Sequence, residues 1–242
     1  MGSFLLVGGS SDIAIILTKK LLDGGNKVTL VVRDESRVSD FPNEMVERFV
    51  GDANDESLVL EAVQSCLSSG GGTMDGVAHL VGSFSVRPPH AMNRESFEEV
   101  LSTNLTSAFV TLSVACKHML RNGGGRVVFT SSVAGSLGLV NHEAISAAKG
   151  GVESMVRSAA ATYSKRGIRV NAVAPGLTET RLSSPITSSE ASKDAAVGMI
   201  PLNRINRAEE VAATMHWLLT EAPDNITGQV FHLDGGMSNV RS

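Results

Sequence analysis

The sequence has little of what stabilises small secreted proteins. It contains only two cysteines among 242 residues, Cys66 and Cys116, which is too few for a disulfide framework. Both lie in apolar stretches typical of helices, where a free cysteine behaves as a small hydrophobic side chain. We therefore expect two buried thiols and a protein of a reducing, cytoplasmic compartment.

Long apolar runs and an excess of positive charge are also missing. No run of about 18 apolar residues is present, so we expect no membrane-spanning helix. Strand-like residues begin at Phe4, which leaves no room for a signal peptide. With 21 basic and 25 acidic residues the net charge is −4, so we predict neither a nucleic-acid nor a membrane partner. The 42% of hydrophobic residues suffice for the core of one domain, residues 1–242.

Short apolar segments rich in Val and Leu alternate with longer helical patterns along the chain. Apolar runs without polar alternation are typical of parallel strands buried on both faces of a sheet. We predict strands over residues 4–7, 27–32, 46–50, 76–81, 125–131, 169–174 and 229–233. Between them we predict helices over residues 13–22, 56–68, 95–120, 142–165 and 208–219. This succession predicts a single-domain, Rossmann-like, doubly wound α/β fold with helices on both faces of a parallel sheet.

The turn after the first predicted strand has the composition of a phosphate-binding site. Gly8, Gly9, Ser10, Ser11, Asp12 and Ile13 separate strand 4–7 from the next helix. Backbone N–H groups and the positive end of that helix would face an anion there. We assign Gly8, Ser10, Ser11, Asp12 and Ile13 to this site. Asp12 either caps the helix, which we favour, or places a negative charge beside the bound phosphate.

Several further segments carry polar residues in a characteristic order. Ser132 lies in the run from Thr130 to Gly135, Lys149 lies seventeen residues later, and Asn104 begins the run from Asn104 to Phe109. Asp52 and Ala53 follow the third predicted strand, and the run from Pro175 to Thr180 follows the sixth. In these segments the sequence resembles the short-chain dehydrogenases/reductases over almost its whole length. The resemblance implies a sheet of about seven strands in the order 3-2-1-4-5-6-7.

The resemblance also implies roles for three polar residues. In that family, Asn104 would position a water in a proton relay, Ser132 would polarise a substrate carbonyl, and Lys149 would bind the nicotinamide ribose. The family carries its proton donor, a tyrosine, four residues before this lysine, where the present chain has Ile145. A positioned acid contributes about 10²–10⁴-fold in rate, so this difference bears directly on catalysis.

Two residues are candidates to replace the missing proton donor. Tyr163, the only tyrosine, lies fourteen residues beyond Lys149, roughly 21 Å along a helix, so we reject it. His142 lies seven residues before Lys149, and both would share one face if the helix begins early enough. Enoyl reductases of the same superfamily carry their tyrosine at this spacing, and imidazole can donate a proton at neutral pH. His142 is therefore a catalytic candidate, the alternative being a loop histidine with no role.

The resemblance further implies a dinucleotide cofactor, and Arg33 bears on its identity. Family members that use NAD have an acidic residue at the tip of the second strand, where this chain has Val32. An arginine at the next position pairs with the 2′-phosphate of NADP, so we favour NADP(H) over NAD(H), unless Asp34 holds Arg33. The remaining implied cofactor-binding residues are Asp52, Ala53, Gly82, Lys149, Pro175, Gly176 and Thr180. We assign no metal ligands, and we interpret His79 as a packed strand histidine.

Two surface features concern substrate and assembly. Segment 176–205 has no clean period and is rich in Ser and Thr, which predicts a mobile flap with substrate contacts or else a plain surface loop. Helix 142–165 carries a patch of small residues: Ala144, Ala147, Ala148, Gly150 and Gly151. The resemblance implies that this helix pairs with a second copy in a dimer or tetramer. The alternative is that these residues pack only on their own chain.

Three functions are compatible with these features. The first is an NADP(H)-dependent oxidoreductase that acts on a carbonyl, hydroxyl or enoyl group of a small molecule, with His142 or ordered water as the proton source. The second is a catalytically impaired nucleotide-binding sensor or scaffold, favoured by Ile145 and the altered glycine turn. The third is a dehydration or isomerisation that needs no tyrosine. We favour the first, because it uses Ser132, Lys149 and Asn104; the sequence does not identify the substrate.

Overall fold

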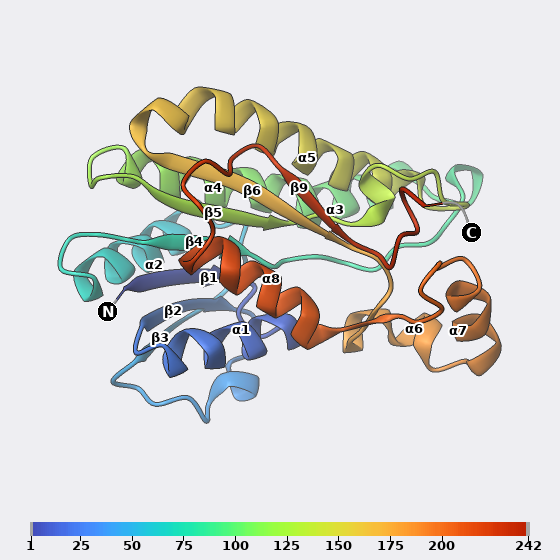
Figure 1. Cartoon of the computed structure of the whole chain (residues 1–242), viewed down its shortest axis with the longest axis horizontal. Coiled ribbons are helices and arrows are strands. Elements are labelled where there is room, and N and C mark those ends of the chain that lie inside the picture. Colours follow the sequence, from blue (N-terminus) through green and yellow to red (C-terminus); the bar gives the residue numbers. More distant parts are fainter. Residues whose placement is uncertain (1, 241–242) are drawn as a thin grey trace.

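Seven parallel strands form the sheet at the centre of the protein. The computed structural model describes residues 2–240, so residue 1 and residues 241–242 of the predicted domain lie outside the described part. The strands run in the order β3-β2-β1-β4-β5-β6-β9 (Figure 1). They are β1 (Ser3–Val7), β2 (Lys27–Val32), β3 (Val46–Val50), β4 (Gly76–His79), β5 (Gly125–Thr130), β6 (Ile168–Pro175) and β9 (Val230–Leu233). The predicted fold and strand order are confirmed, since β7 and β8 form a separate short pair.

Two layers of helices cover the faces of this sheet. On one face, α2 (Glu56–Ser69), α4 (Ser107–Met119) and α5 (Glu143–Tyr163) pack on Leu5, Val77 and Phe129. On the other face, α1 (Asp12–Asp23) and α8 (Ala208–Thr220) pack on Leu6 and Leu30. Figure 1 shows α5 above the sheet and α1 and α8 below it. Because both faces are covered, the central strand β1 is apolar and buried from Phe4 to Val7 rather than alternating.

The predicted helix 95–120 is wrong in one respect, because it is interrupted. It consists of α3 (Arg94–Leu101), a π-helical turn (Ser102–Thr106) and α4. Side chains occupy carbonyls that a regular helix would pair: Asn104 Nδ2 donates to the main-chain oxygen of Val100 at 2.9 Å, and Ser107 Oγ donates to that of Thr103 at 2.6 Å. Single π-turns of this kind are frequent at functional sites.

Segment 176–205 is more regular than the irregular loop that the sequence predicted. It contains β7 (Thr178–Glu179), a 3₁₀ turn (Arg181–Ser183), α6 (Ser184–Thr187) and α7 (Glu190–Val197). Strand β7 pairs with β8 (Asn206–Arg207), just before α8. In Figure 1 this segment, which we call the flap, stands at one end of the sheet. Its mobility stays a prediction.

Most of the small residues in the patch on α5 pack against other parts of the same chain. This corrects our use of the patch as evidence for an interface between copies. Ala144 and Ala148 are buried beside Ile145. A Cβ added to Gly151 would lie 2.9 Å from Leu105, and one added to Gly150 would lie 3.1 Å from the main-chain oxygen of Gly135. The patch therefore gives little support to an interface between copies.

Two predictions about composition can also be compared with the structure. Cys66 and Cys116 are buried and unbridged, as predicted. Burial raises the pKa of the Cys66 thiol to about 11 and that of the Cys116 thiol to about 12, so neither is a nucleophile at neutral pH. Within residues 2–240, none of the helices is both long and apolar enough to cross a membrane.

Candidate functional site

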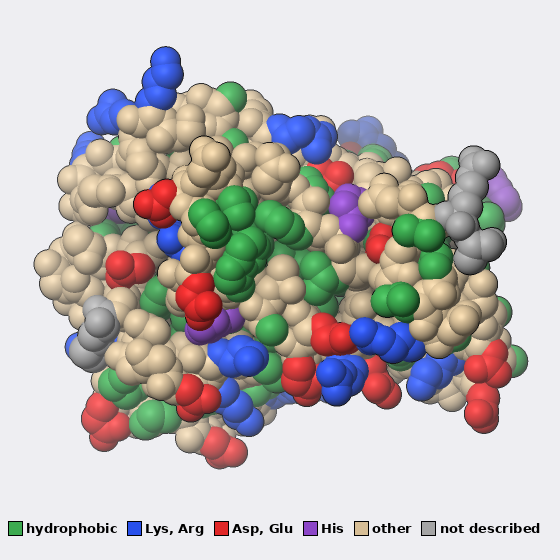
Figure 2. All heavy atoms as spheres, in the orientation of Figure 1, with side chains coloured by type: hydrophobic (Ala, Val, Ile, Leu, Met, Phe, Trp, Pro, Cys, Tyr) green, Lys and Arg blue, Asp and Glu red, His purple; other side chains and the backbone are tan. Residues whose placement is uncertain are grey.

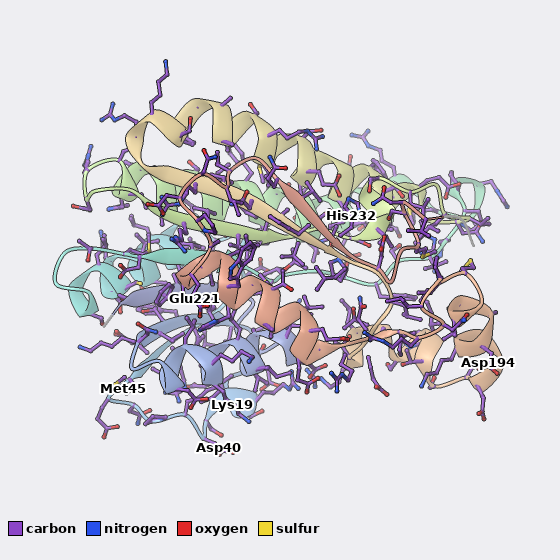
Figure 3. All side chains as sticks on the ribbon, in the orientation of Figure 1. Lys19, Asp40, Met45, Asp194, Glu221 and His232 are labelled. Atoms are coloured by element: carbon purple, nitrogen blue, oxygen red, sulfur yellow. The ribbon has the colours of Figure 1, made fainter. Side chains whose placement is uncertain are left out.

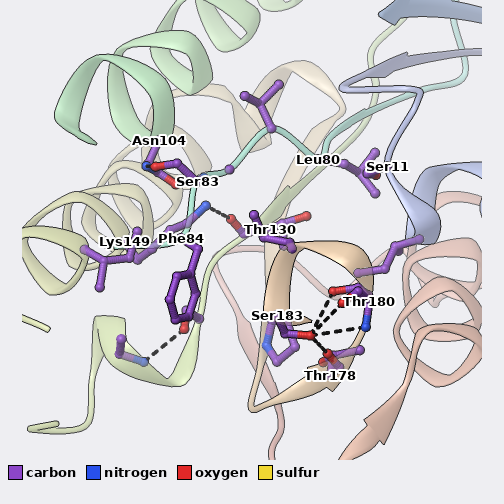
Figure 4. A pocket seen from close by; sticks show the side chains of 18 of the residues that line it. Ser11, Leu80, Ser83, Phe84, Asn104, Thr130, Lys149, Thr178, Thr180 and Ser183 are labelled. Atoms are coloured by element: carbon purple, nitrogen blue, oxygen red, sulfur yellow. Dashed lines mark hydrogen bonds between the residues drawn. The ribbon is translucent and has the colours of Figure 1, made fainter. Parts of the chain in front are cut away.

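A large cavity opens at the carboxyl ends of the strands. Its volume is about 810 Å³. All the residues that we assigned from the sequence line it: Gly8, Ser10, Ser11, Asp12, Ile13, Arg33, Asp52, Ala53, Gly82, Asn104, Ser132, His142, Lys149, Pro175, Gly176 and Thr180. Figure 4 shows Asn104, Ser83, Lys149 and Phe84 on one side of this cavity and Ser11, Thr180 and Ser183 on the other. Ligands of doubly wound sheets bind at this edge.

The glycine turn has the geometry of an anion cradle. Gly8 has a φ of +87°, and a Cβ there would lie 2.8 Å from the backbone carbon of Leu80, so only glycine fits without strain. Ser11, rather than Asp12, caps α1, and its side chain accepts the N–H of Ala14 at 3.2 Å. The predicted capping role of Asp12 is therefore wrong, because Asp12 is already the first residue of the helix.

Asp12 instead joins three separate segments. Its carboxylate lies 2.7 Å from Arg37 Nη2 and accepts the backbone N–H of Arg181, in the flap, at 2.7 Å. Arg37 also donates to the main-chain oxygen of Ser10. Burial raises the pKa of Asp12, but the Arg181 N–H and the Arg37 guanidinium outweigh it, so that the pKa lies below its ordinary value. The negative charge at the glycine turn is thus compensated by two arginines.

At the end of β2, Arg33 projects into solvent at the rim of the cavity. Asp34 does not hold it: the Asp34 carboxylate accepts the N–H of Ser36 at 3.1 Å and its hydroxyl at 2.6 Å. Beyond β3, Asp52 is exposed and accepts the N–H of Asn54 at 2.8 Å. Arg33 is therefore available to an anionic group at this end of the cavity.

Asn104 and Lys149 meet around Gly82. A Cβ on Gly82 would lie 3.4 Å from Asn104 Oδ1 and 3.7 Å from Lys149 Nζ. Asn104 is fully buried; its Oδ1 accepts the N–H of Ser83 at 3.1 Å, and its Nδ2 donates to Ser83 Oγ at 2.8 Å. The π-turn that carries Asn104 thereby fixes the chain after β4.

Lys149 lies beneath the floor of the cavity. Its Nζ donates to the main-chain oxygen of Thr130 at 2.9 Å (Figure 4), and burial lowers its pKa to about 8. One turn further along α5, the buried Glu153 accepts the hydroxyl of Ser131 at 2.8 Å. Ser132 Oγ accepts the N–H of Ala134 at 3.2 Å, which leaves its own O–H to donate toward the cavity.

The N-terminus of α5 brings Ile145 and His142 to the same cavity. Ile145 is 7% exposed and packs with Ala134, Ala144 and Ala148. Helix α5 begins at Glu143 and His142 is its N-cap residue, whose main-chain oxygen accepts the N–H of Ser146 at 2.7 Å, so the helix begins one residue later than predicted. Since a carbonyl only accepts, His142 Nδ1 donates to the main-chain oxygen of Val140 at 2.7 Å, which leaves Nε2 as the nitrogen able to exchange a proton.

Comparisons with known proteins identify the family. A protein-family model described as Enoyl-(Acyl carrier protein) reductase matches residues 8–238. The 3-oxoacyl-[acyl-carrier-protein] reductase MabA of Mycobacterium bovis is 32% identical over 235 residues, covering 97% of this chain and 92% of that protein. The chain belongs to the short-chain dehydrogenase/reductase superfamily.

Solved structures of the superfamily agree with this assignment. A short-chain type dehydrogenase/reductase from Mycobacterium ulcerans matches with a TM-score of 0.90 and 29% identity, over 98% of this chain and 90% of that one. The structure of ElxO with NADP bound matches with a TM-score of 0.88 and 26% identity, over 98% and 99%. The chain is therefore an oxidoreductase-type member of a superfamily that binds nicotinamide dinucleotides.

The remaining histidine near the site is structural, as predicted. His79 is 1% exposed. Ser107 Oγ already donates to Thr103, so His79 Nε2 donates to Ser107 at 3.1 Å and Nδ1 accepts from Thr111 at 3.0 Å. Burial, with a contribution from the charge of Lys149, lowers the pKa of His79 to about 3. His79 is thus a neutral link between β4 and α4.

Sequence reasoning missed four residues that shape the site: Arg37, Ser83, Glu153 and Arg181. Arg37 and Arg181 meet Asp12 from positions 25 and 169 residues away along the chain. The signal that could have found the arginines is the acidic Asp12 in a turn that would face a phosphate, since such a charge calls for compensating cations nearby, but it does not say which.

Proposed function

We propose that the chain is an NADP(H)-dependent oxidoreductase that acts on a carbonyl, hydroxyl or enoyl group of a small molecule, and that Ile145 occupies the family's tyrosine position. The proton would come from His142 or from ordered water. The observation that carries the proposal is one cavity lined by Asn104, Ser132, His142 and Lys149 together with the glycine turn.

The residues present fit the cofactor. The Gly8 turn and the N-terminus of α1 offer backbone N–H groups to the pyrophosphate, and Arg37 and Arg181 offset the charge of Asp12. Arg33 would hold the 2′-phosphate, which is why we favour NADP(H) over NAD(H). Asp52 and Ala53 would contact the adenine, Gly82 and Lys149 the nicotinamide ribose, and Pro175, Gly176 and Thr180 the carboxamide. When bound, the nicotinamide would supply or accept a hydride.

Residues of this chain would bind the substrate oxygen, stabilise its charge and supply the proton. The Ser132 O–H donates to the substrate oxygen, because its Oγ already accepts a bond from Ala134. The Lys149 ammonium places a positive charge beneath the site, where it stabilises negative charge that develops on that oxygen. His142 would release a proton from Nε2, since its Nδ1 donates to the main-chain oxygen of Val140. Ile145 would add an apolar wall to the cavity and would take no part in proton transfer.

Titration with NADPH and NADH, by fluorescence and calorimetry at one salt concentration, tests the cofactor first. We expect NADPH to bind more tightly, and Arg33→Ala to remove that preference. Turnover of carbonyl and enoyl compounds follows, with Ser132→Ala expected to abolish it. If neither dinucleotide binds, the proposal is wrong.

A second candidate function is a nucleotide-binding sensor or scaffold without turnover. It is favoured by Ile145, a buried side chain that cannot transfer a proton. It predicts dinucleotide affinity that Ser132→Ala does not change and no turnover with any substrate. A tyrosine-independent dehydration or isomerisation is distinguished by product formation without oxidation or reduction of the cofactor.

The partners that we propose are a small molecule and further copies of this chain, in a cytoplasmic dimer or tetramer. On the face shown in Figure 2, positive and negative side chains are interspersed, with no broad basic surface for nucleic acid. Exposed Phe109 on α4, which with Tyr163 and Leu112 lines a shallow outer hollow, supports contact between copies.

A further inference from the structure

Exposed apolar side chains gather at the mouth of the cavity. Ten large hydrophobic side chains are exposed among the described residues, and half of them line this one cavity. They are Phe84 (39%), Val86 (40%), Val140 (83%), Leu182 (51%) and Met199 (57%). Single exposed hydrophobic residues are ordinary, but a group around a recess marks a binding surface.

These five side chains come from three segments that enclose the mouth from different sides. Phe84 and Val86 follow β4, Val140 precedes α5, and Leu182 and Met199 belong to the flap. Ile145 lies on the same wall, 7% exposed. The apolar groups therefore form a lined recess that leads inward to Ser132, rather than a flat outer face.

Apart from Arg181 in the flap and Lys149 near Ser132, the charged side chains that line the cavity lie away from this mouth. Asp12, Arg37 and Arg181 form one cluster at the glycine turn, and Arg33 and Asp52 lie at the ends of β2 and β3. Among the described lining residues, the mouth segments 83–86 and 139–140 contribute no charged group. Segment 83–86 offers a sugar or a multiply charged acid only the hydroxyls of Ser83 and Ser85 and no charged partner, so such a molecule would lose water there with little compensation. A hydrocarbon would gain by burial.

We propose that the substrate carries a hydrocarbon portion that lies between the flap and the loops 83–86 and 139–140, with its carbonyl or hydroxyl carbon at Ser132. The inference rests on the proposed function for the reacting end of the substrate. It goes beyond that function in assigning the chemical class of the rest of the molecule.

A homologous series of methyl ketones, from 2-butanone to 2-decanone, tests the proposal by binding rather than by turnover. Affinity is measured by calorimetry with the full chain, with and without saturating NADPH. Burial of each added methylene is expected to raise affinity by about threefold to fourfold, until the chain emerges from the recess. An affinity that does not change along the series overturns the proposal.

Serine substitutions locate the site. Leu182→Ser combined with Met199→Ser is expected to weaken binding of 2-decanone by about tenfold and to leave 2-butanone almost unchanged. The matched control is Leu202→Ser, since Leu202 lies on the same flap, is 63% exposed and is absent from the cavity wall. If the double variant binds the series like the control, the hydrocarbon binds elsewhere and the proposal fails.

The two proposals fail in different ways. If affinity depends on the length of the ketone but the protein binds no dinucleotide, the oxidoreductase function is rejected and the proposal of a hydrocarbon-binding recess stands. Turnover of short polar carbonyl compounds without a chain-length dependence keeps the oxidoreductase function and rejects the hydrocarbon substrate.

Discussion

Replacement of Asp12 is expected to release the flap from the body of the protein. The Asp12 carboxylate accepts the backbone N–H of Arg181 at 2.7 Å and pairs with Arg37 at the same distance. It is the side chain through which the start of α1 holds the 3₁₀ turn of the flap. Asp12→Ala removes both contacts, whereas Asp12→Asn keeps a neutral oxygen for the N–H of Arg181.

The size of the effect follows from the hydrogen bond. A bond to a charged acceptor contributes about 1.5–3 kcal/mol, and the Asp12 side chain is 24% exposed, so partial replacement by water reduces the loss to about 1–2 kcal/mol. That corresponds to an increase of about 5–30-fold in the population of the open flap. Asp12→Asn should lie between Asp12→Ala and the unchanged protein.

Limited trypsin digestion measures this opening, because Arg181 is itself a cleavage site. Cleavage after Arg181 tracks the open population when reclosing is fast. The matched control is Asp194→Asn, which removes one negative charge from α7 at the outer end of the flap (Figure 3). If Asp12→Ala is cleaved there no faster than this control, with equal thermal midpoints, then Asp12 does not hold the flap.

Three further predictions concern the site and the assembly. Because the pKa of Lys149 falls from 10.5 to about 8 on burial, the unfolded chain binds more protons between these values. The free energy of unfolding in urea should therefore rise relative to Lys149→Met, by up to about 1.4 kcal/mol per pH unit above pH 8; parallel pH profiles would contradict this. Ile145→Tyr should raise NADPH-dependent turnover at least about tenfold and make it insensitive to His142→Ala, whereas unchanged turnover would exclude the missing phenol as the limitation. Phe109→Glu should dissociate oligomers seen by light scattering, and a monomeric parent protein would refute that interface.

The strands were the most predictable part of the fold. Segments 27–32 and 46–50 coincide with β2 and β3, because short segments rich in β-branched and aromatic residues between turn residues have few alternative structures. Strand 76–81 was predicted too long, since Leu80 and Val81 already belong to the cavity wall. Leu80 and Val81 also pack against the two core clusters, which is why they resemble strand residues in the sequence.

The π-turn and the flap could not be predicted for a physical reason. The π-turn depends on Asn104 and Ser107 side chains that take backbone carbonyls, and local propensity contains no such information. Helices as short as α6 and α7 are unstable alone and exist only where the rest of the chain supports them, as the β7–β8 pairing and the Asp12 contact do here.

The site was predictable as a set of positions but not as a set of contacts. Motif order placed Ser132, Lys149 and Asn104 in one cavity, because the carboxyl ends of parallel strands converge. The partners of Asp12 depend on which distant arginines the fold brings close. The negative charge of Asp12 in the glycine turn calls for compensation, but the sequence does not show which residues supply it.

Binding and catalysis are separable in this molecule because different segments supply them. In the proposed function, the phosphates of the cofactor would be bound by the glycine turn, Arg33, Arg37 and the flap. The proton would be supplied from the start of α5. In that function Ile145 bears only on the supply of the proton, since it packs with Ala134 and Ala148 at the start of α5. A dinucleotide affinity would therefore say nothing about turnover, and the proton for turnover would have to come from His142 or ordered water. Turnover of a substrate with a hydrocarbon portion should therefore be measured in the Ile145→Tyr and His142→Ala variants. This measurement discriminates between the candidate functions more sharply than cofactor binding does.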